Sequence, residues 1–321
     1  MDEWAAAEAQ RDEIRRAVAA SQPLVGEREP LTALQEEYKA NDAFTAKLAE
    51  VAARYAAFRR VRGDGSCFYR AFLVGITEHL VEEGVVRPSG FADAEAFAAA
   101  APPGAALVRA PALPPALPGP AASQARYEGW LTLARDSLPA LVARGWSAYT
   151  AVDFRDAFLA WLWALGRDGA AAPPVDPAAA LRALGFRDAE ETASFYVLTY
   201  LRCLCALELR AHEDDYAAWV EALAPECASV RQFCDAHVEA VHTDADSLQV
   251  LALATAFGVT CSIAYVDAAP SGAGGGGSSG ALTTITIPDD AAGAGEQPPP
   301  ARPTLRFLYR PGHYDVVYPR S

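Results

Sequence analysis

The chain has 321 residues, enough for one large domain or two modest ones with a buried core. Its 27 Lys and Arg residues stand against 41 Asp and Glu residues, and the resulting net charge of −14 would repel a phosphate backbone, so we expect no nucleic-acid partner. No run approaches the roughly 18 consecutive apolar residues of a membrane span, and the N-terminus Met-Asp-Glu-Trp lacks the basic and apolar segments of a signal peptide. The sequence therefore predicts a soluble intracellular protein with no membrane partner.

The N-terminal residues 1–20 predict a polar helical arm, and we expect the remainder, 21–321, to form a single domain. The apolar stripe of the arm is thin, because it consists of Trp4, Ile14 and Val18. A helix with so little apolar surface is weakly anchored to a core. The arm is therefore either a frayed terminal helix or a helix that becomes ordered on a partner.

Helical spacing of apolar residues is clearest in the first third of the chain. Phe44, Leu48, Val51, Tyr55 and Phe58 recur four and three residues apart, after Asn41 or Asp42 as a helix cap. This pattern predicts a packed helix that includes Tyr55 and Phe58. Further helices are predicted over residues 130–142, 154–165, 195–209, 216–223, 230–241 and 246–257.

Strand patterns come late in the chain. Residues 259–266 and 282–287 alternate and are rich in β-branched side chains, and 305–309 lead through a Pro-Gly turn into 313–318. Helices followed by a group of strands predict an α+β fold.

Three low-complexity segments interrupt these elements. Residues 100–125 are rich in Ala and Pro, residues 270–280 in Gly, and residues 293–300 in Gly and Pro. Proline removes backbone donors, and glycine-rich stretches have no preferred conformation. We expect all three segments to be exposed insertions without regular structure.

The six cysteines are too few for a disulfide scaffold and form no Cys-x-x-Cys pair. A metal site could be drawn from Cys234, His237 and His242, but no fourth ligand has the spacing of a zinc site. We therefore expect neither a metal nor another cofactor. Five of the cysteines are interpreted as small core residues, and Cys67 is the exception.

Cys67 follows the glycine-flexed loop Gly63-Asp64-Gly65-Ser66 and begins an apolar helix. Its sulfur would lie at the positive end of the helix dipole, where a thiolate is stabilised and the exposed amides can receive an oxyanion. The glycines beside Asp64 allow the loop to turn its amides inward. A capped turn with an inert, buried cysteine fits the local pattern equally well.

His313 has the setting of an acid/base catalyst, on a strand directly after a tight turn. Alternation along a strand places His313 and Asp315 on the same face. The carboxylate could hold one ring nitrogen and leave the other for Cys67. Taken without context, a His-x-Asp pair on a strand is also commonly a structural hydrogen bond.

Asp-Gly-Ser-Cys-Phe-Tyr-Arg-Ala-Phe and the C-terminal Tyr-Arg-Pro-Gly-His-Tyr-Asp-Val-Val-Tyr together resemble the otubain subfamily of the ovarian-tumour (OTU) domain cysteine proteases. Residues 23–28, 34–38, 196–202, 232–234 and 248–265 are also otubain-like, so the resemblance covers nearly the whole chain outside the insertions. It implies one OTU-like catalytic domain with a small, mostly antiparallel sheet flanked by helical subdomains.

The resemblance also implies an activity, the hydrolysis of the isopeptide bond between ubiquitin and lysine. Cys67 would be the nucleophile, His313 the general base and Asp315 its orienting acid, while Asp64 would contribute a backbone amide to the oxyanion hole. Ubiquitin and polyubiquitin chains are the expected partners, with ubiquitin-conjugating enzymes bound through the arm at residues 1–20. The expected address is the cytoplasm, with the nucleus as a second location.

Two other functions remain open at the level of sequence. One is a non-catalytic protein that binds ubiquitin or a ubiquitin-conjugating enzyme. The other is a cysteine hydrolase or acyltransferase with a different substrate. The intact set of Cys67, His313 and Asp315 favours catalysis, since a pure binding protein has no need of it.

Overall fold

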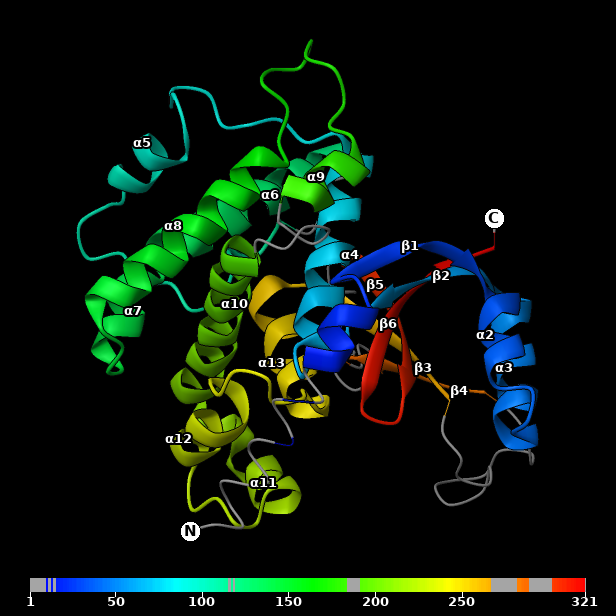
Figure 1. Ribbon diagram of the computed structural model, residues 1–321. Helices are drawn as coiled ribbons and strands as arrows, with labels where there is room; N and C mark the ends of the chain where they lie inside the picture. The colour runs from blue at the N-terminus through cyan, green and yellow to red at the C-terminus, as the bar shows by residue number, and fades with distance from the viewer. Residues whose placement is uncertain are drawn as a thin grey trace.

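The computed structural model describes residues 10, 13, 16–114, 117, 119–183, 191–266, 282–288 and 302–320. Figure 1 shows most of the helices gathered on one side of the molecule and the sheet on the other, with α4 (Cys67–Glu83) between them. Two further helices, α2 (Leu31–Glu37) and α3 (Asp42–Arg54), lie against the sheet away from that helical body. The sheet is thus packed between helices, which confirms the α+β prediction.

The described strands form one sheet of six in the order β1-β2-β6-β5-β3-β4. Only β3 and β5 are parallel neighbours, so the sheet is mostly antiparallel, as expected. The strands are β1 (Val25–Pro30), β2 (Tyr55–Val61), β3 (Thr260–Tyr265), β4 (Thr283–Ile287), β5 (Thr304–Arg310) and β6 (His313–Pro319). The four late strands lie where their sequence patterns predicted them.

The helical body is built by the middle of the chain. It contains α5 (Ala94–Ala99), α6 (Gly119–Asp136), α7 (Leu138–Ala143), α8 (Ala148–Ala164), α9 (Pro177–Ala183), α10 (Glu191–Ala211), α11 (Glu213–Leu223), α12 (Val230–Phe233), the π-helical turn η1 (Cys234–Val238) and α13 (Ser247–Phe257). As predicted, Asp246 and Gln249 form a capping box at the start of α13, and Gly258 ends it in the left-handed conformation. Among the described helices, none is long and apolar enough to cross a membrane.

The first two strands were not predicted, and the assignment of Tyr55 and Phe58 to a helix is wrong. The helix α3 ends at Arg54, and both residues lie on β2. Phe58 pairs with Glu29 of β1 and Val317 of β6, and its side chain is fully buried in the core beneath α2 and α3. Long-range pairing with a strand from the far end of the chain therefore overrides the local helical spacing.

The segment 100–125 is not the wholly exposed insertion that the sequence predicts. The amides of Leu107 and Ala110 donate to the carbonyl oxygens of Asp136 (3.0 Å) and Ala256 (2.8 Å). The helix α6 begins within the segment, at Gly119. Proline restricts the backbone only at its own position in the chain. The apolar stretch between the proline clusters can therefore pack against the core, as it does here.

The same segment also supplies a charge partner to the core. The side chain of Arg109 pairs with both carboxylate oxygens of Glu208, whose own side chain has no exposed surface. A buried carboxylate without a partner would be costly, which explains why this part of the segment is held in place.

Several expectations concern residues outside the described part of the chain. The insertions at 270–280 and 293–300 and the apolar residues Trp4 and Ile14 of the arm belong to this group. Of the predicted arm, residues 16–20 are helical, and Val18 is half-buried.

Candidate active site

The loop before α4 depends on two glycines. Gly65 has φ +80°, and a Cβ built there would lie 2.1 Å from the carbonyl oxygen of His242, so only glycine fits. A Cβ at Gly63 would lie 3.3 Å from Nδ1 of His313. The bare backbone at this position therefore lets the imidazole approach the loop closely. Cys67 is the first residue of α4 and is only 1% exposed.

Aromatic packing brings the start of α4 onto the sheet. The ring of Phe68 contacts those of Phe307 on β5 (5.9 Å between centroids) and Tyr314 on β6 (5.4 Å). Since Phe68 follows Cys67 and Tyr314 follows His313, the contact between the two rings brings the thiol of Cys67 close to the imidazole of His313.

Asp64 stabilises the loop through its carboxylate. It accepts two hydrogen bonds from the guanidinium of Arg70 (2.9 and 2.7 Å) and one from the Ser66 amide (3.1 Å). Burial favours the neutral acid, but the bonds from Arg70 outweigh it and hold the pKa of Asp64 below its usual value. The amide of Asp64 donates to the carbonyl oxygen of Arg62 (3.2 Å). Its contribution to an oxyanion hole stays a prediction.

A second buried arginine, Arg202 on α10, ties the loop to the segment after η1. Its guanidinium makes five hydrogen bonds, to Gly65 O, Ser66 Oγ, Val238 O, Ala240 O and Thr243 O. It also lies over the ring of Tyr69, 4.1 Å from the centroid. No role was predicted for Arg202, although an arginine within an apolar helix is itself a signal of a buried polar network.

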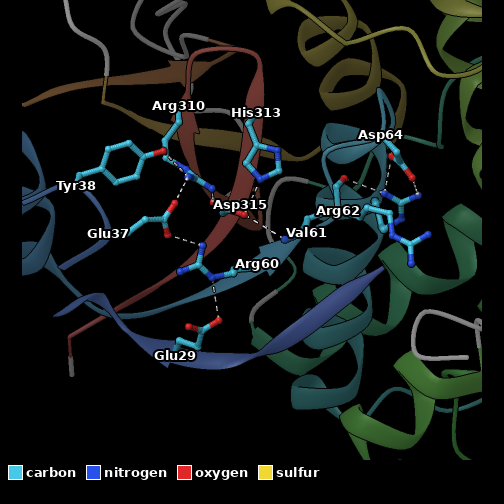
Figure 2. A network of polar contacts seen from close by, with 11 residues as sticks. Glu29, Glu37, Tyr38, Arg60, Val61, Arg62, Asp64, Arg310, His313 and Asp315 are labelled. Carbon is cyan, nitrogen blue, oxygen red and sulfur yellow. Dashed lines mark hydrogen bonds and ion pairs between the residues drawn. The ribbon is translucent and has the colours of Figure 1, made fainter. Parts of the chain in front are cut away.

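The β5–β6 hairpin supplies the other half of the site, as Figure 2 shows. Nε2 of His313 lies 2.9 Å from Oδ1 of Asp315, which confirms that the two side chains share a face of the strand. Asp315 has no exposed surface and also accepts hydrogen bonds from the Val61 amide (3.1 Å) and from Arg310 (2.6 Å). Three donors, one on the same strand and one on each neighbouring strand, therefore fix the carboxylate.

These contacts set the protonation of the site. Burial lowers the pKa of His313, but hydrogen bonds with Asp315 and then Cys67 outweigh it and raise the pKa to about 9. For Asp315, burial is outweighed by the bond from His313 and the charge of Arg310, and its pKa is lowered. Because Nε2 is held by Asp315, Nδ1 is the nitrogen that remains for the thiol. A protonated imidazole there stabilises a thiolate.

A wider network supports Arg310 from the surface (Figure 2). The guanidinium of Arg310 donates to the hydroxyl of Tyr38 (2.9 Å) and lies 3.8 Å from Glu37. Glu37 in turn pairs with Arg60 (2.8 Å), which also binds Glu29 (3.1 Å). The helix α2 and the strands β1 and β2 thereby connect to the buried carboxylate beside His313.

The structure thus brings together Cys67, His313 and Asp315, with Asp64 in the loop that carries the cysteine. His242 also belongs to this neighbourhood, since its Nδ1 lies 3.1 Å from the carbonyl oxygen of Asp64. His242 was not predicted to lie at this site. Its backbone has φ +65°, a conformation that is rare outside glycine and that the sequence does not reveal.

Comparison with known proteins supplies the family context of this geometry. The family model described as "Peptidase C65 Otubain" matches residues 17–96 and 121–319 and so passes over most of the 100–125 segment.

Among curated proteins, the chain is similar to a "Ubiquitin thioesterase otubain-like" of Caenorhabditis elegans, with 27% identity over 94% of this chain and 83% of the relative. It is also similar to "Ubiquitin thioesterase OTUB1" of Homo sapiens, with 26% identity over 97% and 88%. A third relative is the "OVARIAN TUMOR DOMAIN-containing deubiquitinating enzyme 1" of Arabidopsis thaliana, with 25% identity over 99% and 89%.

Among solved structures, a complex of h/ceOTUB1 with ubiquitin aldehyde and UBCH5B~Ub has a similar fold. Its TM-score is 0.68 and its sequence identity 26%, and the match covers 100% of this chain and 99% of that one. The corresponding complex with UBC13~Ub gives the same TM-score and identity. The likeness therefore extends over the whole fold.

Proposed function

Since the chain belongs to the otubain family of cysteine peptidases, we propose that Cys67, His313 and Asp315 carry out its activity. It is a deubiquitinating enzyme, a thiol-dependent isopeptidase that hydrolyses the bond between the ubiquitin C-terminus and a lysine side chain. The observation that carries the assignment of residues is that Asp315 holds Nε2 of His313, while Nδ1 faces the glycine loop that leads into Cys67.

The reaction follows from the positions of these groups. The Cys67 thiolate attacks the carbonyl carbon of the ubiquitin C-terminus, and amides at the start of α4 stabilise the oxyanion. The Asp64 amide joins them once it releases the carbonyl oxygen of Arg62. The His313 imidazolium gives its proton to the departing lysine amine and leaves ubiquitin as a thioester on Cys67. His313 then takes a proton from water, which hydrolyses the thioester and restores the thiolate. Asp315 holds the ring in the orientation that both steps need.

The partners of the enzyme are ubiquitin and polyubiquitin chains, and ubiquitin-conjugating enzymes form a second class of partner. The similar solved complexes hold both kinds of protein. Contact with the conjugating enzyme or the leaving-side ubiquitin through residues 1–20 is part of our proposal, as are a single catalytic domain over 21–321 and a cytoplasmic and nuclear address. Fluorescence microscopy of the tagged chain tests the address.

A panel of ubiquitin dimers of every linkage tests the function. We expect the wild-type chain to cleave at least one linkage, and the Cys67→Ala variant to cleave none while it still binds the dimers. The Cys203→Ala variant, which changes a buried cysteine away from the loop, is the control and should retain cleavage. A wild-type chain that binds dimers or a conjugating enzyme but cleaves nothing would instead favour a non-catalytic regulator.

A further inference from the structure

A second cluster of reactive side chains lies in a pocket of about 270 Å³ that adjoins the active site. The pocket is lined by Tyr309 of β5 and by Gly312 of the turn that precedes His313. The carboxylates of Glu226, Asp244 and Asp246 and the ring of His237 also line it. Three acids around one small pocket favour a cation over an anion.

Glu226 and His237 of this pocket lie beside Cys227, and the three side chains offer metal ligands of different chemistry. A carboxylate oxygen of Glu226, Sγ of Cys227 and a ring nitrogen of His237 all lie within 4.8 Å of one another. Nε2 of His237 is 3.1 Å from Oε1 of Glu226. Ligands at 2.0–2.3 Å around a tetrahedral zinc ion lie roughly 3–4 Å from each other, so small side-chain movements would bring these three into range, with water as the fourth ligand.

The backbone positions His237 for this role. His237 lies in the π-helical turn η1, and such turns are rare and occur frequently at functional sites. Its ring is stacked on Phe233 (5.2 Å between centroids), and its carbonyl oxygen accepts a hydrogen bond from Gln249 (3.2 Å). Both contacts leave Nε2 directed at Glu226. They also limit the conformational entropy that the His237 side chain would lose on binding a metal.

The structure also decides which cysteine accompanies His237. The sequence paired this histidine with Cys234, three residues earlier. Cys234 is fully buried, and its sulfur faces the carbonyl oxygen of Ala206 on α10 (3.9 Å). Cys227, in the turn between α11 and α12, faces His237 instead.

We propose that Glu226, Cys227 and His237 form a binding site for a zinc-class divalent cation. A mixture of thiolate, imidazole and carboxylate suits zinc or cobalt, whereas calcium and magnesium prefer oxygen ligands alone. On binding, the Cys227 thiol releases its proton to solvent and its sulfur bonds to the cation. None of the three ligands is a proposed catalytic residue, so the proposal stands or falls independently of the isopeptidase assignment.

The direct test is titration of the full chain with Co²⁺, which reports a sulfur ligand through a thiolate-to-metal absorption band. The Cys67→Ala background removes the competing thiol of the active site. We expect the band in this background and its displacement by Zn²⁺. Cys227→Ser should abolish it, and His237→Ala and Glu226→Gln should each weaken Co²⁺ binding by at least about tenfold.

Two matched variants serve as controls. Cys234→Ser changes the cysteine that lies closer to His237 in sequence, and Glu221→Gln changes an exposed acid near the end of α11. Both should leave the band and the affinity unchanged, and circular dichroism of each metal-free variant verifies its fold. The proposal is wrong if no band forms, if the band survives in Cys227→Ser, or if Cys234→Ser removes it as well.

Discussion

The loop that carries Cys67 and the hairpin that carries His313 reach the same site by different physical means. The hairpin is held by the hydrogen-bond ladders of β5 and β6, which backbones of almost any sequence can form. The loop has no ladder and is fixed by two buried arginines, Arg70 and Arg202, which bind its carboxylate and carbonyl oxygens. We infer that the conformation of the loop depends on particular side chains. The conformation of the hairpin depends mainly on backbone hydrogen bonds, and its side chains set the charge of the site.

Substitutions within the triad should have the largest effects, on the hairpin side of this comparison. His313→Ala should abolish turnover, because it removes the group that gives the proton to the departing amine. Asp315→Asn should reduce turnover by a factor about a hundredfold smaller than His313→Ala does. It disturbs the orientation of the His313 ring but leaves the nucleophile and the oxyanion amides in place. Steady-state cleavage of a ubiquitin dimer measures both variants. If Asp315→Asn keeps wild-type turnover, the orienting group must be another residue.

Loss of Arg202 should have the largest effect on the stability of the loop. Arg202→Met leaves five acceptors without their buried donor, so we expect the free energy of unfolding to fall by about 3–5 kcal/mol. Urea unfolding followed by fluorescence measures the change. Arg231→Met, at an exposed arginine on α12, is the control and should stay within about 0.5 kcal/mol of wild type. Equal changes in both variants would show that Arg202 does not hold the loop.

Arg310 should affect the protonation of His313 in the hairpin, and its loss should reduce stability less than the loss of Arg202. In the wild type, His313 is protonated below its pKa of about 9, so turnover should decline as the pH rises through that value. Arg310→Ala removes a positive charge that disfavours the imidazolium, so the alkaline limb should move to higher pH.

The control variants separate charge from packing at this position. Arg310→Lys keeps the charge and should keep the limb near its wild-type position. Arg306→Ala changes an exposed arginine on the same strand and should not move it. If the alkaline limb of the pH profile is unchanged in Arg310→Ala, Arg310 supports only the fold and has no effect on the protonation of His313.

The smallest effects should come from the N-terminal arm. Removal of residues 1–15 should change the free energy of unfolding by less than about 0.5 kcal/mol. Removal of residues 1–22 should cost about 1 kcal/mol more, since Arg62 beside the Cys67 loop donates to the carbonyl oxygens of Ala19 and Gln22. Thermal unfolding of both truncations tests this. A large loss of stability in the shorter truncation would show that the arm belongs to the packed core.

The sequence predicted the parts of the site whose signals are local. The glycine-flanked Cys67, the start of its helix and the shared face of His313 and Asp315 follow from spacing within a few residues. The strand β2 and the role of Arg202 could not be predicted, because both depend on partners far along the chain. The packed position of Arg109 depends likewise on Glu208, a carboxylate that only the folded chain buries.

Covalent capture tests the central claim most directly, because it identifies the nucleophile itself. A single ubiquitin with a C-terminal electrophile should form one adduct, and peptide mass mapping should place it on Cys67. The five remaining cysteines, Cys203, Cys205, Cys227, Cys234 and Cys261, lie outside the loop at the start of α4 and do not pair with His313, so they should stay unmodified. His313→Ala should greatly slow the capture, since the thiolate loses its counterion. An adduct on any other cysteine, or a rate that does not depend on His313, would contradict the assignment of the site.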